Sequence, residues 1–365
     1  MNEPAERADI SVVIPCLNEA GTLAEVIREA EEGIASTGLR GEVVVADNGS
    51  ADGSQKLAEA SGARVVNVPI RGYGAALHFG ILGARGRWVL FGDADLSYDF
   101  RLLPRFLAHI QETDPAKSMD LVLGSRLRGT IEPGAMPFLN RHLGTPVLNL
   151  AIRVFTGLST SDCNSGMRLV RTEFYRQLPM RAPGMEWASE LLIKTQILGG
   201  RYAEVPITLR PDKRGRPPHM RRWRDGWRHL KSIVLLNPDP LIVLPSLALL
   251  GLAFVQLWRE QPVHVLLSTT LGGAGMALAM LVKLVLHVDG VRRSPLIGLL
   301  LRHAFAELML GTGFIGTVWG VWQILWVSSF SVGSLLVLMT GTLLLLLSFA
   351  WGVLVTHCLH TLDSR

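Results

Sequence analysis

"WVLFGDADLSYDF", residues 88–100, decides how the chain is interpreted, because an apolar run leads directly into three carboxylates. Trp88–Phe91 is typical of a buried strand, and Asp93, Asp95 and Asp99 follow it. Side chains at positions i and i+2 of an extended chain project to the same side, so we expect Asp93 and Asp95 to lie close together. Two such carboxylates raise each other's pKa unless a cation separates them. The stretch therefore predicts a hard divalent ion, Mg²⁺ or Mn²⁺, whose shell is completed by the phosphates of a ligand.

Outward from this stretch, β-branched runs alternate with helix-length segments up to about residue 236. Five runs predict strands: Ile10–Ile14, Glu42–Ala46, Arg64–Val68, Arg87–Phe91 and Asp120–Leu123. Segments such as 19–32 and 73–84 predict helices between them. The alternation indicates an α/β domain with a mostly parallel sheet. Ligands of such sheets bind at the carboxyl ends of the strands, beside the point where strand order reverses.

Polar loops follow three of these strands, in residues 15–20, 47–54 and 93–99. Two of them have a purely structural alternative. Asn18 with Glu19 can simply open a helix, and Asp47 can form an Asx turn ahead of a helix cap. The residues alone leave both alternatives open. For Asp93 and Asp95 we favour the metal with a diphosphate, because a turn does not require two adjacent carboxylates.

The last third of the chain has the composition of a membrane domain, in a protein of 365 residues with 48% hydrophobic side chains. Four windows predict transmembrane helices: Leu241–Trp258, His264–Val288, Met309–Val327 and Gly333–Thr356. The N-terminal residues carry no export signal, and Arg292, Arg293 and Arg302 lie in the second loop between these windows. We therefore expect an integral membrane protein whose first domain is cytoplasmic. The predicted parts are residues 1–209, a basic segment 210–239 and a membrane domain 240–365.

The basic segment combines many cations with an apolar stripe. Its cations up to residue 231 are Arg210, Lys213, Arg214, Arg216, Arg221, Arg222, Arg224, Arg228 and Lys231. The spacing of Met220, Trp223, Trp227, Leu230 and Val234 predicts a helix that lies in the headgroup layer of membrane lipids. A nucleic-acid site is the alternative for so basic a segment. The adjoining membrane window argues against it, so no nucleic-acid partner is expected.

Several motifs occur in the order typical of one enzyme family. They are "VVIPCLNEAGTL", "VVVADNGSADGS", "RGYGAALHFGI", "DADLSYD", "GSR" at 124–126 and "DCNSGMRLV" at 162–170. Over residues 9–235 the chain resembles the inverting family-2 glycosyltransferases, in particular the polyprenyl-phosphate branch. The resemblance implies a GT-A nucleotide-sugar fold with a UDP- or GDP-linked donor. It also allows a homo-oligomer, since membrane-anchored relatives often self-associate.

The resemblance also assigns roles to individual residues. The implied donor-binding residues are Pro15, Asn18, Glu19, Asp47, Gly72 and Asp93. Asp93 and Asp95 would meet the ribose, the metal and the diphosphate, and Arg126 would lie near the phosphates. Ser97 stands where relatives with a "DADLQH"-like motif carry Gln, and its oxygen is the third candidate metal ligand. The glycine-rich turn at Gly72 lacks the remaining glycine of a dinucleotide fingerprint, which argues against a nicotinamide enzyme.

The predicted acceptor is a polyprenyl phosphate of the undecaprenyl or dolichyl type. Such a monophosphate, with a second pKa near 6, is mostly dianionic at neutral pH, so the reaction needs no catalytic base. Asp162, Glu186 and Glu190 are then expected to position the sugar or the arginines, although Glu190 has a structural alternative. The implied catalytic set is Asp93, Asp95, Arg126 and Asp162. The cations expected to bind the acceptor phosphate are Arg126, Arg210, Lys213 and Arg214.

Two other functions remain as alternatives. Processive polysaccharide synthases carry Gln-x-x-Arg-Trp on an interfacial helix, and residues 219–223, "HMRRW", differ from that motif in the first position. Only four predicted spans, none before the first domain, argue against a synthase. A catalytically inactive membrane scaffold is the second alternative. Analysis of the product separates the three, as one sugar on a lipid phosphate, a polymer, or nothing.

Overall fold

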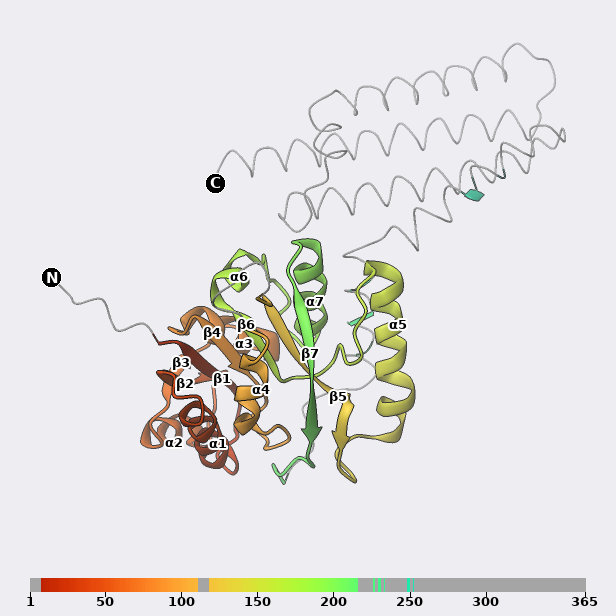
Figure 1. The fold of residues 1–365 in the computed structure, drawn as a ribbon. Coiled ribbons are helices and arrows are strands. Elements are labelled where there is room, and N and C mark those ends of the chain that lie inside the picture. The colour runs from red at the N-terminus through yellow and green to blue at the C-terminus, as the bar shows by residue number, and fades with distance from the viewer. Residues whose placement is uncertain are drawn as a thin grey trace, which may run out of the picture. The chain divides into compact units, whose positions relative to one another are not determined.

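The computed structural model describes residues 8–110 and 118–215, and the isolated positions 226, 229, 230, 233, 248, 249 and 252. The chain divides into two compact units, 1–233 and 234–365, and nearly all described residues belong to the first (Figure 1). No helix within the described part is long and apolar enough to cross a membrane. The four predicted spans lie outside that part, apart from helical positions 248, 249 and 252 in the first of them. Most of the predicted interfacial helix also lies outside it.

The first unit is built on a seven-stranded sheet with the order β3-β2-β1-β4-β6-β5-β7. The strands are β1 (Ile10–Cys16), β2 (Gly41–Asp47), β3 (Arg64–Asn67), β4 (Trp88–Phe91), β5 (Leu121–Ile131), β6 (Arg168–Arg171) and β7 (Tyr202–Leu209). β6 runs antiparallel to both of its neighbours, and all other pairs of adjacent strands are parallel. The prediction of a mostly parallel α/β sheet is therefore confirmed, with one antiparallel strand that the sequence did not reveal.

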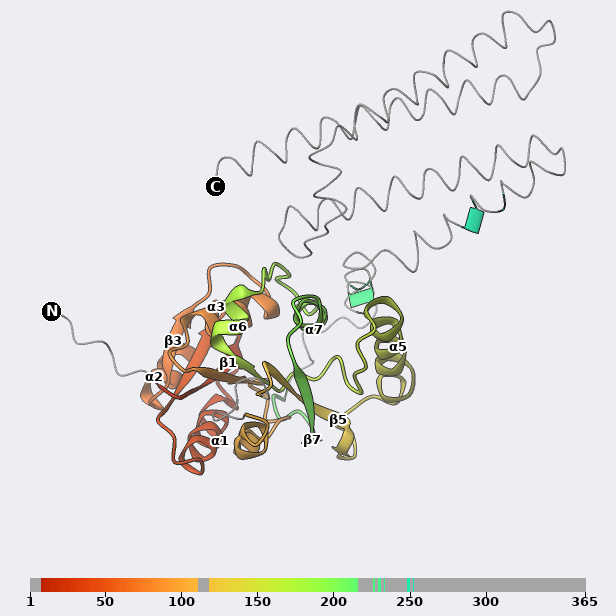
Figure 2. The same cartoon turned by 45° about the horizontal axis from the view of Figure 1, so that its top comes forward.

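Helices cover both faces of the sheet. They are α1 (Leu23–Ala35), α2 (Ser54–Ala60), α3 (Tyr73–Gly83), α4 (Leu103–Leu107), α5 (Thr145–Thr156), α6 (Thr172–Gln177) and α7 (Trp187–Ile197), with the short helices η1 (Phe100–Leu102) and η2 (Asn140–Gly144). α1 packs against α2, α4 and η1 on one face, and α3 packs against α6 and α7 on the other (Figure 2). α5 lies beyond β5 and β7, at the end of the sheet (Figures 1 and 2).

The local sequence explains the central elements. All seven residues of β1, "ISVVIPC", are buried, as expected for a central parallel strand whose two faces are covered by helices. α3 approaches this strand closely because Gly80 has no side chain. A Cβ at Gly80 would lie 2.6 Å from a methyl group of Val13 and 3.0 Å from the Cβ of Ala46. The tight contact fixes α3, and the loop before it, against the carboxyl ends of β1 and β2.

One predicted geometry is wrong. Asp93 and Asp95 were expected on an extended chain, but β4 ends at Phe91 and residues 94–97 form a turn. Leu96 in that turn has φ +65°, in the left-handed region that a large side chain rarely adopts. The buried Leu96 side chain belongs to the hydrophobic core, and this packing holds the strained turn in place. The turn, rather than strand alternation, therefore determines where the two carboxylates lie.

Candidate active site

Strand order reverses between β1 and β4, because the chain continues from β1 to β2 on one side and β4 lies on the other. The loops that follow these two strands contain Asn18, Glu19, Asp93 and Asp95. The hydroxyl of Thr22, just before α1, donates a 2.6 Å hydrogen bond to the carbonyl of Ala94 and so joins the two loops. The predicted residues therefore meet at the position where parallel α/β sheets bind ligands.

The loops after β1 and β2 are joined by hydrogen bonds. The backbone N–H of Ala51 donates to Asn18 Oδ1 at 2.8 Å, and the N–H of Asn18 donates to the Ser50 hydroxyl at 2.8 Å. Asn18 adopts φ +59°, which an Asn tolerates better than most residues. Glu19, at the end of the same loop, is buried. The loop is therefore a rigid turn with a buried carboxylate.

Asp47 ends β2 and forms an Asx turn. Its carboxylate accepts hydrogen bonds from the N–H groups of Gly49 (2.9 Å) and Ser50 (3.1 Å) and from Gln55 Nε2 (2.6 Å). Burial acts to raise the pKa of Asp47, but these donors outweigh it and hold the pKa below its usual value. Asp47 therefore does form the Asx turn that was the structural alternative to a binding role. Its contact with a nucleoside stays a prediction.

Gly72 lies at the start of α3 in a conformation that only glycine fits. It has φ +144°, and a Cβ there would approach the carbonyl oxygen of Pro183 to 2.0 Å. The neighbouring Asn48 holds this turn from both sides. Its Oδ1 accepts from the N–H of Gly72 at 2.8 Å, and its Nδ2 donates to the carbonyl of Ile70 at 2.7 Å. The turn presents Tyr73 to the carboxylates.

Asp93 is held by Tyr73, whose hydroxyl donates to Asp93 Oδ1 at 2.8 Å. Burial of the carboxyl group raises the pKa of Asp93 to about 7, and the negative charge of Asp95 acts in the same direction. The hydrogen bond from Tyr73 and the charges of Arg214 and Arg126 oppose this shift. Asp93 is therefore poised between its protonated and charged forms near neutral pH.

Asp95 is fully engaged by protein donors. Its Oδ1 accepts from the backbone N–H (3.0 Å) and the hydroxyl (2.5 Å) of Ser97, and its Oδ2 accepts from Arg214 Nη2 at 2.7 Å. Ser97, a candidate metal ligand, thus positions Asp95 in this structure. The Arg214 guanidinium lies beside Asp95, where a metal cation was expected from the sequence, and its positive charge neutralises the Asp95 carboxylate.

The four cations expected to bind the acceptor phosphate do not lie together. Arg214 contacts Asp95, Glu19 (3.5 Å) and Asp212 (2.7 Å), all of them carboxylates. Arg210 lies elsewhere, paired with Glu29 at 2.9 Å and with Asp99. The backbone N–H groups of Arg210 and Lys213 donate to the carbonyls of Ser97 and Asp95, which fastens this loop onto the turn after β4. Residues 210–214 are therefore held against the turn that carries Asp95.

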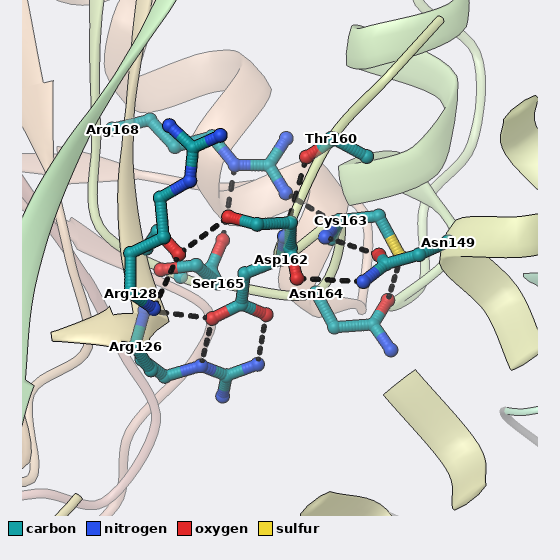
Figure 3. Close-up of polar contacts among 12 residues, drawn as sticks. Arg126, Arg128, Asn149, Thr160, Asp162, Cys163, Asn164, Ser165 and Arg168 are labelled. Atoms are coloured by element: carbon teal, nitrogen blue, oxygen red, sulfur yellow. Dashed lines mark hydrogen bonds and ion pairs between the residues drawn. The ribbon is translucent and has the colours of Figure 1, made fainter. Parts of the chain in front are cut away.

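Arg126 and Asp162, from segments far apart in the chain, form a bidentate ion pair (Figure 3). Arg126 donates through Nε and Nη2 to the two carboxylate oxygens at 2.7 Å, and its backbone N–H adds a third bond at 2.9 Å. Only 13% of the Arg126 side chain and 1% of the Asp162 side chain are exposed. Although burial acts against the charge, Tyr98 and Asp162 hold the pKa of Arg126 above its usual value. Asp162 thus orients Arg126, as one of its predicted roles requires.

The loop that carries Asp162 is fixed by two further side chains (Figure 3). Asn149 of α5 donates to the carbonyl of Ser161 at 2.6 Å and accepts from the N–H of Cys163 at 3.0 Å. The fully buried Arg168 donates to the carbonyls of Cys163, Ser165 and Ala188. Burial lowers the pKa of Arg168. Its charge, satisfied by these carbonyls, interacts electrostatically with Tyr73, Tyr98 and Asp162.

The remaining base candidates differ from each other. Glu190 accepts hydrogen bonds from the N–H groups of Arg181 and Ala182 and from Lys194, so its structural alternative is supported. Glu186 has one carboxylate oxygen, Oε2, that is buried without a hydrogen-bond partner among the described residues. Its loop packs against the glycines on either side of Tyr73. Glu186 therefore retains a hydrogen-bond acceptor in the loop that packs beside Tyr73, whose hydroxyl binds Asp93.

The donor atoms fit a divalent ion, with the ligand supplying part of the shell. Asp93 and Asp95 provide hard oxygen ligands, and the raised pKa of Asp93 indicates a carboxyl group that a nearby cation would ionise. No group of three His, Cys, Asp or Glu side chains in the described part is arranged to hold a metal. Mg²⁺ is commonly bound by one or two carboxylates together with substrate phosphates, and Asp93 and Asp95 are two such carboxylates.

Sequence reasoning missed Asn48, Tyr73, Tyr98, Asn149 and Arg168. The hydroxyl of Tyr98 accepts a hydrogen bond from the N–H of Gly166 at 2.9 Å, beside Asp93. Burial raises the pKa of Tyr98 to about 12, so the phenol stays protonated. Tyr73 stands between two glycines and Tyr98 ends the "DADLSY" run, which were usable signals. Asn149 and Arg168 gave none, because their partners are backbone groups.

Comparison with known proteins agrees with this site. Residues 11–178 match the model of the glycosyl transferase family 2. The hexosyltransferase Agl6 of low-salt glycan biosynthesis in Haloferax volcanii is 35% identical over 276 residues, which are 74% of this chain and 65% of that protein. The chain thus spans slightly less than two thirds of Agl6. A dolichyl-phosphate hexose transferase of the same organism is 32% identical over 208 residues, 55% of this chain and 83% of that protein.

Among solved structures, the glucosyl-3-phosphoglycerate synthase of Mycobacterium tuberculosis in complex with Mn²⁺, UDP and phosphoglyceric acid is 26% identical. The similarity covers 62% of this chain and 76% of that one, with a TM-score of 0.46. The family match includes the loops after β1, β2 and β4 and the Arg126–Asp162 pair. On the match to the family model and to the two Haloferax volcanii relatives, the chain belongs to glycosyl transferase family 2.

Proposed function

We propose that the protein transfers one hexose from a nucleotide sugar to a polyprenyl phosphate, in a metal-dependent reaction that inverts the anomeric centre. The observation that carries the proposal is the meeting of Asp93, Asp95, Arg126 and Arg214 in one electrostatic cluster at the reversal of strand order. Two carboxylates supply ligands for a cation, and two arginines supply charge for phosphates. A hexosyl transfer between two phosphate-bearing substrates requires both.

The donor would lie along the loops after β1 and β2, as the family resemblance implies. Asn18 and Glu19 are held in a rigid turn, and the Asx turn of Asp47 sets the edge of this surface. A divalent ion, Mg²⁺ or Mn²⁺, would be held by Asp93 and Asp95, and when bound it would neutralise the leaving diphosphate. Ser97 keeps Asp95 oriented for this role, and Tyr73 does the same for Asp93.

The acceptor phosphate would be bound by Arg126. Its guanidinium is oriented by Asp162 through Nε and Nη2, and Nη1 lies outside that pair. Arg214 is the second candidate, since Asp95 would release it when a metal takes its place. Arg210 is balanced by Glu29 and Asp99 and is a weaker candidate than we expected from the sequence. An arginine fork suits a phosphate because it donates two parallel hydrogen bonds.

A phosphate acceptor also explains why two of the candidate bases are already bound to other groups of the protein. A hydroxyl acceptor would need a base, whereas a dianionic phosphate attacks directly. Asp162 is committed to Arg126 and Glu190 to a backbone loop, so neither is arranged to take a proton. This favours a phosphate acceptor over the hydroxyl acceptor of a polysaccharide synthase. Glu186 is assigned to the sugar, whose hydroxyl group would satisfy its buried oxygen.

The proposal includes an integral membrane protein with a cytoplasmic catalytic unit. It rests here on the apolar windows after residue 240 and on the dolichyl-phosphate acceptor in the name of one relative. The test is to incubate membranes that contain the full chain with labelled UDP- and GDP-sugars and undecaprenyl phosphate. One sugar on the lipid phosphate supports the proposal. A water-soluble polymer supports the synthase, and no product with any donor supports the scaffold.

A further inference from the structure

An apolar stripe lies on the outer side of η2 and α5. Six large apolar side chains in this segment are between 49% and 73% exposed: Phe138, Leu139, Leu143, Val147, Leu150 and Val154. From Leu139 onward their spacing is 4, 4, 3 and 4 residues, which places them on one face of a helix. A continuous apolar surface of this kind is rare on a soluble protein and indicates an interaction site.

The opposite face of α5 is the one that packs on the domain. Thr145 and Ile152 are buried, and Asn149 is bound to the loop that carries Asp162. At about 100° per residue, these three positions lie on the side opposite to the stripe. The residues of the apolar stripe are therefore not the ones that pack α5 onto the core of the domain. The stripe is an additional, exposed surface on a helix that lies at the edge of the domain (Figure 2).

The charged side chains within the segment that carries the stripe all have one sign. Residues 133–161 contain no Asp or Glu, whereas Arg141, His142 and Arg153 are exposed beside the apolar positions. A second copy of the chain packed through this stripe with antiparallel helices would bring Arg141 near Arg153 of its partner, and these like charges would repel. A surface of anionic headgroups over acyl chains complements both the stripe and its basic margin.

We propose that η2 and α5 lie flat in the headgroup layer of an anionic bilayer, with this stripe among the acyl chains. The helix is tied to the domain at both ends, by β5 and by the loop of Asp162, so it lies along the bilayer rather than across it. The inference extends the proposed function, and its consequence for the acceptor phosphate rests on that function. Asn149 connects the helix to Asp162, and Asp162 orients Arg126, so the docked helix would bring the phosphate-binding arginine to the headgroup layer.

The test uses the full chain in vesicles of three parts phosphatidylcholine to one part phosphatidylglycerol. A nitroxide is attached at Leu150→Cys, in a Cys358→Ser background, because the other two cysteines are buried. Leu39→Cys is the matched control, because Leu39 is an exposed leucine outside the stripe, between α1 and β2. Collision rates of each label with oxygen, which partitions into lipid, and with a water-soluble nickel chelate are then compared.

We expect the ratio of oxygen to nickel collisions to be several-fold higher at Leu150→Cys than at Leu39→Cys. Val147→Cys, on the same face, should repeat the result if the first label perturbs the helix. Equal ratios at both sites would place the stripe in water, and low rates with both reagents would show that protein covers it. Either result would overturn the inference. The readout is independent of sugar transfer, so a lipid-facing stripe in a protein without lipid-linked product would refute the proposed function alone.

Discussion

Removing the charge of Asp162 while keeping its shape should strongly destabilise the domain. Asp162→Asn leaves Arg126 buried without its carboxylate partner and replaces one of the acceptor oxygens at 2.7 Å by a donor. Breaking a buried ion pair from one side costs about 3–5 kcal/mol, because the remaining charge is neither paired nor hydrated. For a domain of this size, 1 kcal/mol corresponds to about 2–4 °C in Tm. The expected loss in Tm is therefore about 6–20 °C.

The measurement is thermal unfolding of the full chain in detergent, followed by intrinsic tryptophan fluorescence. Glu32→Gln is the control, since it removes one charge from the Arg28–Glu32 pair, whose side chains are 58% and 41% exposed. Exposed pairs at this spacing contribute about 0.3–0.5 kcal/mol, which corresponds to a change of at most about 2 °C. If Asp162→Asn lowers Tm no more than Glu32→Gln, the pair does not hold Arg126 in the way described.

Four further predictions concern the reaction. Asp95→Ala should abolish both Mn²⁺ binding and transfer while the fold is retained, with a lower Tm because Arg214 loses one of its carboxylate partners. Undiminished turnover in excess chelator would remove the metal from the mechanism. The pKa of Asp93 is raised from 3.8 to about 7, so its carboxyl group stabilises the folded domain below about pH 4, and this stabilisation is lost as the pH rises through 7. Asp93→Asn should flatten this pH dependence of the free energy of unfolding, measured by unfolding at a series of pH values. Glu186→Gln should leave Tm unchanged or higher but lower kcat/KM for the donor about tenfold, since it weakens a hydrogen bond to the sugar; an unaltered kcat/KM would exclude this role. An α-linked donor should give a β-linked lipid product by NMR, and retention would contradict single displacement.

The sequence was most informative where a strand is buried on both faces. The β-branched runs at residues 10–14 and 42–46 predicted β1 and β2 within two residues at either end, because a central parallel strand has few polar positions. β6, with arginines at both ends of only four residues, carries no such signal. Its antiparallel direction follows from the path of the whole chain. Local patterns of residues therefore do not reveal it.

The same distinction applies to the site. Asp93, Asp95 and Asn18 stand in polar loops directly after strands, and the topology alone brings such loops together. The pairing of Arg126 with Asp162 spans 36 residues and depends on β5 lying beside β6. The separation of Arg210 from Arg214 depends on which carboxylates each one meets after folding. The partners of a charged side chain in a loop are decided by tertiary structure, so composition alone could not distinguish these two arginines.

The central claim is that a phosphate, and not a hydroxyl group, receives the sugar. The most direct measurement gives the full chain in vesicles the same labelled nucleotide sugar with either undecaprenyl phosphate or undecaprenol, and follows the label into the lipid phase. Because Asp162 and Glu190 are committed to other partners and Glu186 is assigned to the sugar, we predict label on the phosphate and none on the alcohol. Equal transfer to undecaprenol, or transfer to neither lipid together with a soluble polymer, would contradict the account.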